Sequence, residues 1–318
     1  MVAACLESNM ESFKSILVDI DATASAQPAL ERAILLAKRS GATLTVADAV
    51  TVPDYARHYL PAGIEERLVL DRRLQLARIA KQVSDVQAQP LLLVGRPATA
   101  LIEEVLRSNH DLLLRSHARD LTTSGPSGFG AVDMELLRKC PCPVLLVRQG
   151  QPATTPRIAC AIDASSEDPD MQALNRKVVE LALLMARCLE SDSPTLFHAW
   201  VPFGERAVRK YAVDDEFAAY LENARQRAGS SLTRIARSFE GQFDARATVL
   251  RRGEPQEVIP EFVVSEGIDM LVMGTVARGG ISGMLIGNTA ERVLRKLPCS
   301  VATVKPDGFV SPVRLENH

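Results

Sequence analysis

A glycine-rich segment in the second half of the chain carries the residue types that could hold a phosphate group. Residues 274–290 read GTVARGGISGMLIGNTA, which places five glycines within seventeen residues. Glycine lets backbone N–H groups approach an anion closely. We expect a helix to start at Asn288-Thr289, where free N–H donors and the positive end of the helix dipole attract phosphate. Arg278 would add charge-assisted hydrogen bonds. A glycine-rich surface loop without a ligand is the alternative that these residues leave open.

An aspartate follows the first predicted strand of each half, Asp21-Ala22-Thr23 in one and Asp163-Ala164-Ser165 in the other. Its carboxylate could accept hydrogen bonds from a ribose or a base amine. It could equally cap the loop or helix that follows. The two interpretations carry equal weight. The candidate cofactor-binding residues are Asp163, Ala164, Gly274, Thr275, Arg278, Gly280, Gly287, Asn288 and Thr289.

No catalytic motif of the nucleotide-binding α/β enzymes occurs, neither G-x-x-x-x-G-K-[ST] nor G-x-S-x-G. We expect His198 to be a hydrogen-bonded core residue, and His110 and His117 to flank a strand without forming a metal site. Cys140 and Cys142 are too close in sequence for the usual chelate. Because Cys142 recurs as Cys299, a buried strand role is expected for both. The sequence therefore predicts no catalytic residue and no metal ligand.

Two halves repeat one pattern in the same order. LLRKCPCPVLLV (Leu136–Val147) and VLRKLPCSVATV (Val293–Val304) share seven of twelve positions. Gly95-Arg96-Pro97 recurs as Gly253-Glu254-Pro255, and ILVDIDA recurs as IACAIDA. Such internal similarity is typical of a duplicated domain. The predicted domains are residues 13–148 and 157–305, joined by a linker at 149–156 and followed by a tail at 306–318.

Each half alternates short apolar runs with helical spacing, which predicts a parallel sheet with helices on both faces. Strands are expected at Phe13–Ile20, Thr43–Val50, Pro90–Val94, Asp111–Arg115, Val144–Arg148, Arg157–Ile162, Thr195–Trp200, Ala245–Leu250, Met270–Met273 and Ser300–Val304. Helices are expected at Gln27–Arg39, Ile64–Val83, Pro97–Asn109, Ala131–Lys139, Gln172–Leu189, Glu216–Phe239, Gln256–Ser265 and Asn288–Leu297. Two long loops, Pro53–Gly63 and Pro202–Asp215, are expected to lie over the sheets as potential lids.

At these residues each half resembles a universal stress protein domain. The resemblance rests on the aspartate after the first strand, the Gly-x-Pro before the third helix, the fourth strand and the glycine-rich loop. It implies an adenine nucleotide alpha hydrolase-like fold with two tandem five-stranded parallel sheets. It also implies pairing of the two halves through their last strands, and it leaves room for a homodimer.

The resemblance further implies ATP with Mg²⁺ as the ligand, bound through a Gly-x2-Gly-x9-Gly-(Ser/Thr) motif. Gly274 and Gly287 match that motif, whereas Ala277 and Asn288 depart from it. The methyl group of Ala277 penalises the positive φ that glycine allows, so ATP binding is expected to be weakened. In the first half Ser116 stands where the second half has Gly274, and that site is expected to be degenerate.

Composition narrows the function. A net charge of −2 and a pI near 6.3 give no basic surplus for a nucleic-acid backbone. No apolar run is long enough to span a membrane, and Met1–Ser12 has no signal-peptide core, so we expect a cytoplasmic protein. The leading hypothesis is a non-catalytic stress-response module that binds a nucleotide or a related small molecule. The alternatives are a weak nucleotide hydrolase and a scaffold without a small-molecule ligand.

Overall fold

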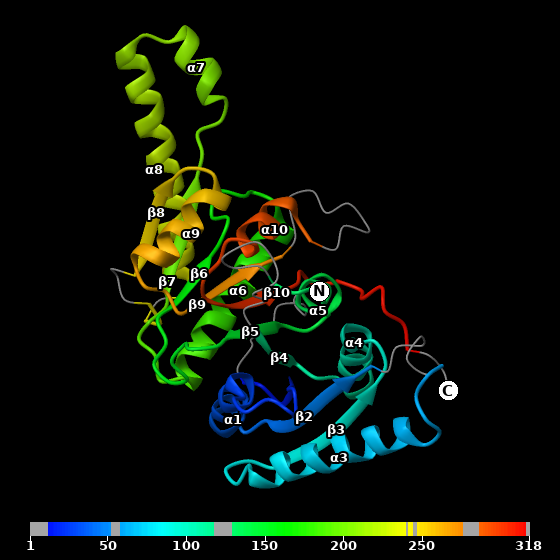
Figure 1. Cartoon of the computed structure of the whole chain (residues 1–318). Helices are drawn as coiled ribbons and strands as arrows, with labels where there is room; N and C mark the ends of the chain where they lie inside the picture. Colours follow the sequence, from blue (N-terminus) through cyan, green and yellow to red (C-terminus); the bar gives the residue numbers. More distant parts are fainter. Residues whose placement is uncertain are drawn as a thin grey trace, which may run out of the picture.

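A computed structural model describes residues 12–51, 58–117, 129–239, 241–243, 247–275 and 286–315. Figure 1 shows two α/β halves whose strands run into one continuous sheet, with helices on both of its faces. None of the described helices is long and apolar enough to cross a membrane.

Within its described residues the first half contains five strands that alternate with four helices, as the sequence predicts. They are β1 (Ser15–Asp19), α1 (Pro28–Ser40), β2 (Thr43–Val50), α3 (Ile64–Gln82), β3 (Ala88–Val94), α4 (Pro97–Ser108), β4 (Leu112–His117), α5 (Ala131–Lys139) and β5 (Val144–Arg148).

The described residues of the second half repeat this order and include the short helix α7. Its elements are β6 (Ile158–Ala161), α6 (Pro169–Cys188), β7 (Thr195–Trp200), α7 (Glu205–Tyr211), α8 (Asp214–Ser238), β8 (Thr248–Arg252), α9 (Pro255–Ser265), β9 (Met270–Gly274), α10 (Asn288–Leu294) and β10 (Ser300–Val304).

The strand order is β3-β2-β1-β4-β5-β10-β9-β6-β7-β8. Each half is therefore a parallel sheet of order 3-2-1-4-5, and the halves join where β10 pairs antiparallel with β5. This confirms the expected pairing of the last strands. Because that junction is antiparallel, the carboxyl ends of the strands in one half lie at the same edge as the amino ends in the other. The two switch points, between β1 and β4 and between β6 and β9, thus open at opposite edges.

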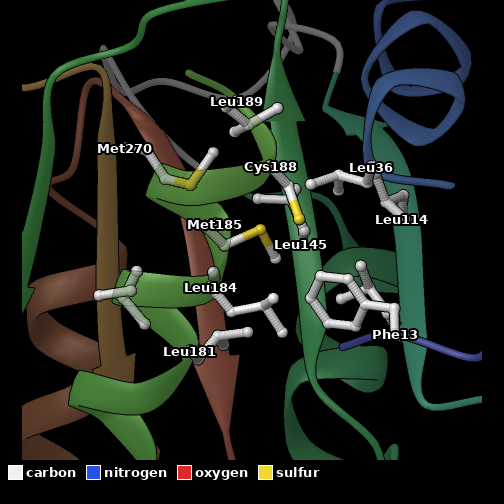
Figure 2. Packing of buried hydrophobic residues seen from close by; sticks show 14 of the residues in the cluster. Phe13, Leu36, Leu114, Leu145, Leu181, Leu184, Met185, Cys188, Leu189 and Met270 are labelled. Atoms are coloured by element: carbon white, nitrogen blue, oxygen red, sulfur yellow. The ribbon is translucent and has the colours of Figure 1, made fainter. Parts of the chain in front are cut away.

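Two apolar layers cover the ten-stranded sheet, and each contains residues of both halves. Figure 2 shows the layer on the α1 and α6 side, where Phe13, Leu36 and Leu145 of the first half lie opposite Leu184 and Met185 of α6. These side chains are almost fully buried. Burying apolar area across the junction stabilises the two halves as one body.

Polar contacts also cross the junction. Arg138 of α5 forms an ion pair with Glu291 of α10 at 2.9 Å. The ammonium group of Lys305, which follows β10, donates to the carbonyl oxygens of Leu137 and Arg138 at 2.6 and 3.1 Å. Carbonyl groups in the last turn of a helix have no partner within the helix, so this lysine completes the end of a helix in the other half.

The expected bounds of several elements differ from the structure, and the clearest cases are a loop, a helix and a strand of the second half. The segment Pro202–Asp215 is not simply a loop, because it contains α7, which packs no buried side chain and stands with the start of α8 away from the sheet (Figure 1). Helix α6 begins at Pro169 rather than Gln172, because Asp168 caps it by accepting from the Asp170 amide at 3.0 Å. Strand β8 begins at Thr248 rather than Ala245.

Candidate functional site

The predicted residues of the second half converge on its switch point. Asp163 and Ala164 follow β6, while Gly274 and Thr275 end β9, and the two strands are neighbours in the sheet. In an open parallel sheet, ligands bind outside the carboxyl ends of the strands at this position. We refer to this region as the half-two site.

The loop after β6 is fixed by two side chains from elsewhere in the fold. Asn175 of α6 accepts from the Asp163 amide at 3.1 Å and donates to the Asp163 carbonyl oxygen at 2.8 Å. Nε2 of His198 lies 2.8 Å from the Ser165 hydroxyl, and its Nδ1 lies 3.1 Å from the Ile162 carbonyl oxygen. His198 is buried, so it is the hydrogen-bonded core residue that the sequence predicts. Asp163 does not cap α6, since Asp168 occupies that position.

The two ends of the glycine-rich segment meet at the half-two site. The Gly287 amide donates to the Thr275 carbonyl oxygen at 2.8 Å, and the Thr275 amide donates to the Val304 carbonyl oxygen at 3.3 Å. Thr275 is completely buried. The intervening loop is therefore tied at its base to the end of β10. Arg278, Gly280 and Ala277 lie outside the described residues.

Packing accounts for the glycine at position 274. A Cβ atom there would stand 2.7 Å from Cδ2 of Leu174 in α6. Gly274 thus lets α6 lie close to β9, whatever else it does for a ligand. Gly287 differs, because its φ of −76° and ψ of 144° suit any residue.

Asn288 and Thr289 are both exposed at the start of α10. The helix is shorter than predicted and ends at Leu294 instead of Leu297. Because a helix of two turns has a small dipole, the backbone of the loop has to supply most of any anion binding here.

The corresponding switch point of the first half holds a cavity of about 670 Å³. We refer to it as the half-one pocket. Its charged lining residues come from five different elements and loops. They are Asp19, Asp21, Asp48, Arg72, Arg115 and His117.

A continuous charge network fills one wall of the half-one pocket. Arg115 of β4 forms ion pairs with Asp19 of β1 and, at 3.0 Å, with Asp133 of α5. Asp133 also lies 2.9 Å from Nδ1 of His117 and accepts from the Gly130 amide at 3.1 Å. Asp19, His117 and Asp133 are buried. The Arg115 side chain therefore bridges β4 and β1 across the switch point.

A second pair of carboxylates faces Arg72 of α3. Its guanidinium group bonds Asp21 at 2.8 Å and Asp48 at 3.1 Å. Burial raises the pKa of Asp48, although the Ala22 amide and Arg72 oppose the shift. Asp21 is mostly exposed. Partial burial would raise its pKa, but hydrogen bonds from Thr23, together with the charge of Arg72, outweigh this and lower it. Asp21 accepts from the Thr23 amide at 2.9 Å, so it caps its own loop.

The second half has no counterpart of the network around Arg115. At the equivalent positions it carries Ala161, Met273, Thr275 and Ala290 in place of Asp19, Arg115, His117 and Asp133. Sequence reasoning missed this difference. The signal was present, since Asp19 and Arg115 interrupt apolar strand runs, where a charge needs a buried partner.

His110 and His117, the two histidines that flank a predicted strand of the first half, are both buried. His110 precedes β4 and His117 ends it, so the two rings lie at opposite ends of one strand. No described group of three or more metal-ligating side chains exists. Cys299 is buried, but Cys142 is only partly so, and both precede their strands. The expectation that both lie within a buried strand was wrong in this respect.

A sheet order of 3-2-1-4-5, repeated in tandem, with a glycine-rich segment at one switch point, defines a tandem doubly wound α/β protein. The sequence profile of the universal stress protein family matches residues 12–148 and 155–305. The chain therefore belongs to the universal stress protein family, as a tandem member with two such domains.

Full-length relatives have the same tandem arrangement. The chain is 30% identical to universal stress protein E of Escherichia coli (strain K12), across 97% of this chain and 99% of the relative. It is 28% identical to universal stress protein E of Photorhabdus laumondii, across 96% and 99%. The fold matches a functionally unknown protein from Pseudomonas aeruginosa PAO1 with a TM-score of 0.70, at 24% identity over 94% of both chains.

Proposed function

We propose that this tandem universal stress protein binds an adenine nucleotide at the half-two site and acts as a binding module without turnover. One observation carries the proposal. Thr275 and Gly287 are bonded at the base of the glycine-rich segment, and this base lies beside the loop of Asp163 at the switch point. Backbone amides of a glycine-rich loop held at that place suit a phosphate.

Charge distribution supports an assignment to the second half rather than the first. In the half-one pocket each arginine already faces two carboxylates, so neither is available to a phosphate. Three carboxylates and two guanidinium groups leave a net negative lining, which repels a polyanion such as ATP. At the described positions equivalent to Asp19, Asp21 and Asp133, the second half has Ala161, Asp163 and Ala290. We therefore infer that only the second half takes a nucleotide.

The described side chains at the half-two site support binding without turnover. His198 and Asn175 are the polar side chains that fix the loop of Asp163, and both are occupied by backbone and hydroxyl groups. Neither is placed as a general base for an attacking water. A weak hydrolase and a scaffold without ligand remain the competing functions, and the experiment below separates them.

The test is equilibrium dialysis of the full chain against labelled ATP and Mg²⁺, beside a Gly287→Arg variant. The backbone angles of Gly287 suit any residue, so the substitution adds no backbone strain; because Gly287 is buried, a urea titration of the variant shows whether it stays folded. The matched control is Gly130→Arg, at the equivalent start of α5 in the first half. Its angles, φ −67° and ψ 170°, are equally permissive.

Saturable binding that Gly287→Arg abolishes and Gly130→Arg preserves would support the proposal. Equal loss in both variants, or binding that survives Gly287→Arg, would refute the assignment to the second half. Release of ADP above the level of the Gly287→Arg variant would favour the hydrolase. The same dialysis is repeated with cAMP, because another universal stress protein has been solved in complex with cAMP. Absence of binding at millimolar concentrations of both ATP and cAMP would favour the scaffold.

A further inference from the structure

The ten-stranded sheet has two free edges, β3 in the first half and β8 in the second. At β8, the Leu196 amide donates to the Ala247 carbonyl oxygen and the Gly253 amide donates to the Trp200 carbonyl oxygen. Hydrogen bonds of a parallel pair alternate along the strand. Odd-numbered residues of β8 therefore bond to β7, and Thr248, Leu250 and Arg252 present their N–H and C=O groups outward.

The other edge has the same geometry but is blocked. In β3 the outward positions are the even-numbered ones, since Leu44 donates to the Gln87 carbonyl oxygen and Gly95 donates to that of Val50. Pro90 occupies one of them, and proline has no N–H to offer an added strand. Thr248 occupies in the second half the position that Pro90 occupies in the first. Thr248 pairs with Leu196 of β7, as Pro90 pairs with Val46 of β2. Only the β8 edge thus keeps its full set of outward donors.

A groove of about 770 Å³ runs beside the β8 edge. Leu250 of β8 lines one side of this groove, and residues of α8 line the rest. Its floor on α8 is made of the small residues Gly229, Ser230 and Thr233. A Cβ added to Gly229 would lie 3.6 Å from Cδ2 of Leu250, so α8 approaches β8 closely at this glycine. The hollow itself lies over the small residues of α8 next to Leu250.

The rim of the groove is basic. Arg225, Arg234 and Arg237 line it, and all three are exposed. Arg225 is paired with Glu222, whereas among the described residues neither Arg234 nor Arg237 has a recorded ion pair or hydrogen bond. The arginines of the strand itself are paired, Arg251 with Glu266 at 3.1 Å and Arg252 with Glu205. Two positive charges consequently face the groove without a carboxylate.

We propose that the groove between α8 and the free edge of β8 binds an extended acidic peptide segment of a partner protein, which pairs with β8 as an eleventh strand. Outward N–H and C=O groups supply the strand pairing. Arg234 and Arg237 supply charge complementarity and select an acidic partner.

A single-stranded nucleic acid would meet the same charges but is disfavoured. None of the residues that line the groove is aromatic, so bases have no surface on which to stack. A second copy of this chain is disfavoured as well, because pairing two β8 edges would bring two sets of unpaired arginines together.

The experiment measures binding of the full chain to a dye-labelled eight-residue peptide in which glutamate alternates with valine, by fluorescence anisotropy. Three probes of equal length accompany it: the peptide with lysine in place of glutamate, the glutamate peptide N-methylated at alternate residues, and an oligo-dT. N-methylation removes the donors needed for strand pairing and keeps the charge, and it leaves the protein unchanged.

Two variants test the protein side. Thr248→Pro introduces a proline where the equivalent strand of the first half already has Pro90. It should weaken peptide binding about fivefold or more, because proline removes one backbone N–H donor and its ring hinders an added strand. Arg234→Ser with Arg237→Ser should weaken it about tenfold at low salt and flatten its salt dependence. Arg73→Ser with Arg78→Ser on α3, the matching helix at the blocked edge, is the control and should change nothing.

The expected result is preference for the glutamate peptide over all three other probes. Equal binding of the N-methylated peptide would overturn strand pairing, and tighter binding of oligo-dT would assign the groove to nucleic acid. Absence of binding at millimolar peptide would mean that the arginines protect the edge instead of recruiting a partner, and it would also overturn the proposal.

Discussion

Replacing Lys305 by methionine should change how the stability of the protein depends on pH. Lys305 is 6% exposed, and its ammonium group bonds two carbonyl oxygens at the end of α5 and lies 4.8 Å from the centre of the Phe309 ring. Burial lowers the pKa of Lys305 from 10.5 to about 8, a shift that the nearby Cys140 only partly opposes. Between these two pKa values the unfolded chain binds a proton that the folded chain does not.

The sign and size of the effect follow from this difference. Where the unfolded state binds more protons, the free energy of unfolding rises with pH. With pKa values of about 8 folded and 10.5 unfolded, the wild-type protein should gain about 2 kcal/mol between about pH 7 and about pH 9.5 from this group alone. Buried Cys160 and Cys299, whose pKa values burial raises to about 12, act in the opposite direction above about pH 9.

Comparison with the Lys305→Met variant isolates the lysine, because the cysteine contributions cancel. Urea titrations of both proteins at a series of pH values give the two free energies of unfolding. Lys296→Met is the control, since Lys296 is half-exposed and paired with Glu257 at 2.8 Å. A difference between wild type and Lys305→Met that stays constant with pH would refute the reasoning, as would an equal slope for Lys296→Met.

Three further predictions concern the two switch points. Arg115→Met should lower the free energy of unfolding by ~3 kcal/mol, because it leaves the buried carboxylate of Asp19 without its partner. Adding Asp19→Ala should recover much of that loss in a urea titration. A double variant that is no more stable than Arg115→Met alone would contradict this. Gly274→Ala should cost ~1–3 kcal/mol through the clash with Leu174, but close to nothing in a Leu174→Ala background, as a thermal double-mutant cycle will show. Ala277→Gly should tighten ATP binding roughly tenfold in equilibrium dialysis, because it removes the Cβ penalty at a position where the family motif has glycine; unchanged affinity would mean that this methyl group is not what weakens the site.

Strand and helix order was predictable from the chain because each half repeats the same local signals. Thr43–Val50, Ala131–Lys139 and Ser300–Val304 were predicted with the bounds that the structure has. Helix α7 was missed because its seven residues bury no side chain, so no apolar periodicity marks them. The strand order and the antiparallel junction of β5 with β10 could not be derived from local pattern, since pairing depends on contacts between distant segments.

The half-two site was predictable in its parts but not in its geometry. Sequence placed Asp163, Gly274 and Gly287 after the right strands, and the structure brings these positions to one switch point. It could not show that Gly274 is required by Leu174, because that contact joins residues a hundred positions apart. Arg278 and Gly280 lie outside the described residues, so their part in binding stays a prediction.

The antiparallel junction has a consequence for how the two halves diverged. Since the two switch points open at opposite edges of one sheet, a ligand at one cannot touch the other, and each could change without disturbing its twin. In the first half Arg115 pairs with Asp19 across the switch point, and this pair forms one wall of the half-one pocket. The second half has Ala161 and Met273 at those positions, so this charged pair is not repeated there. The two halves are nevertheless joined by contacts at the junction, where Lys305 bonds the end of α5 and Arg138 pairs with Glu291.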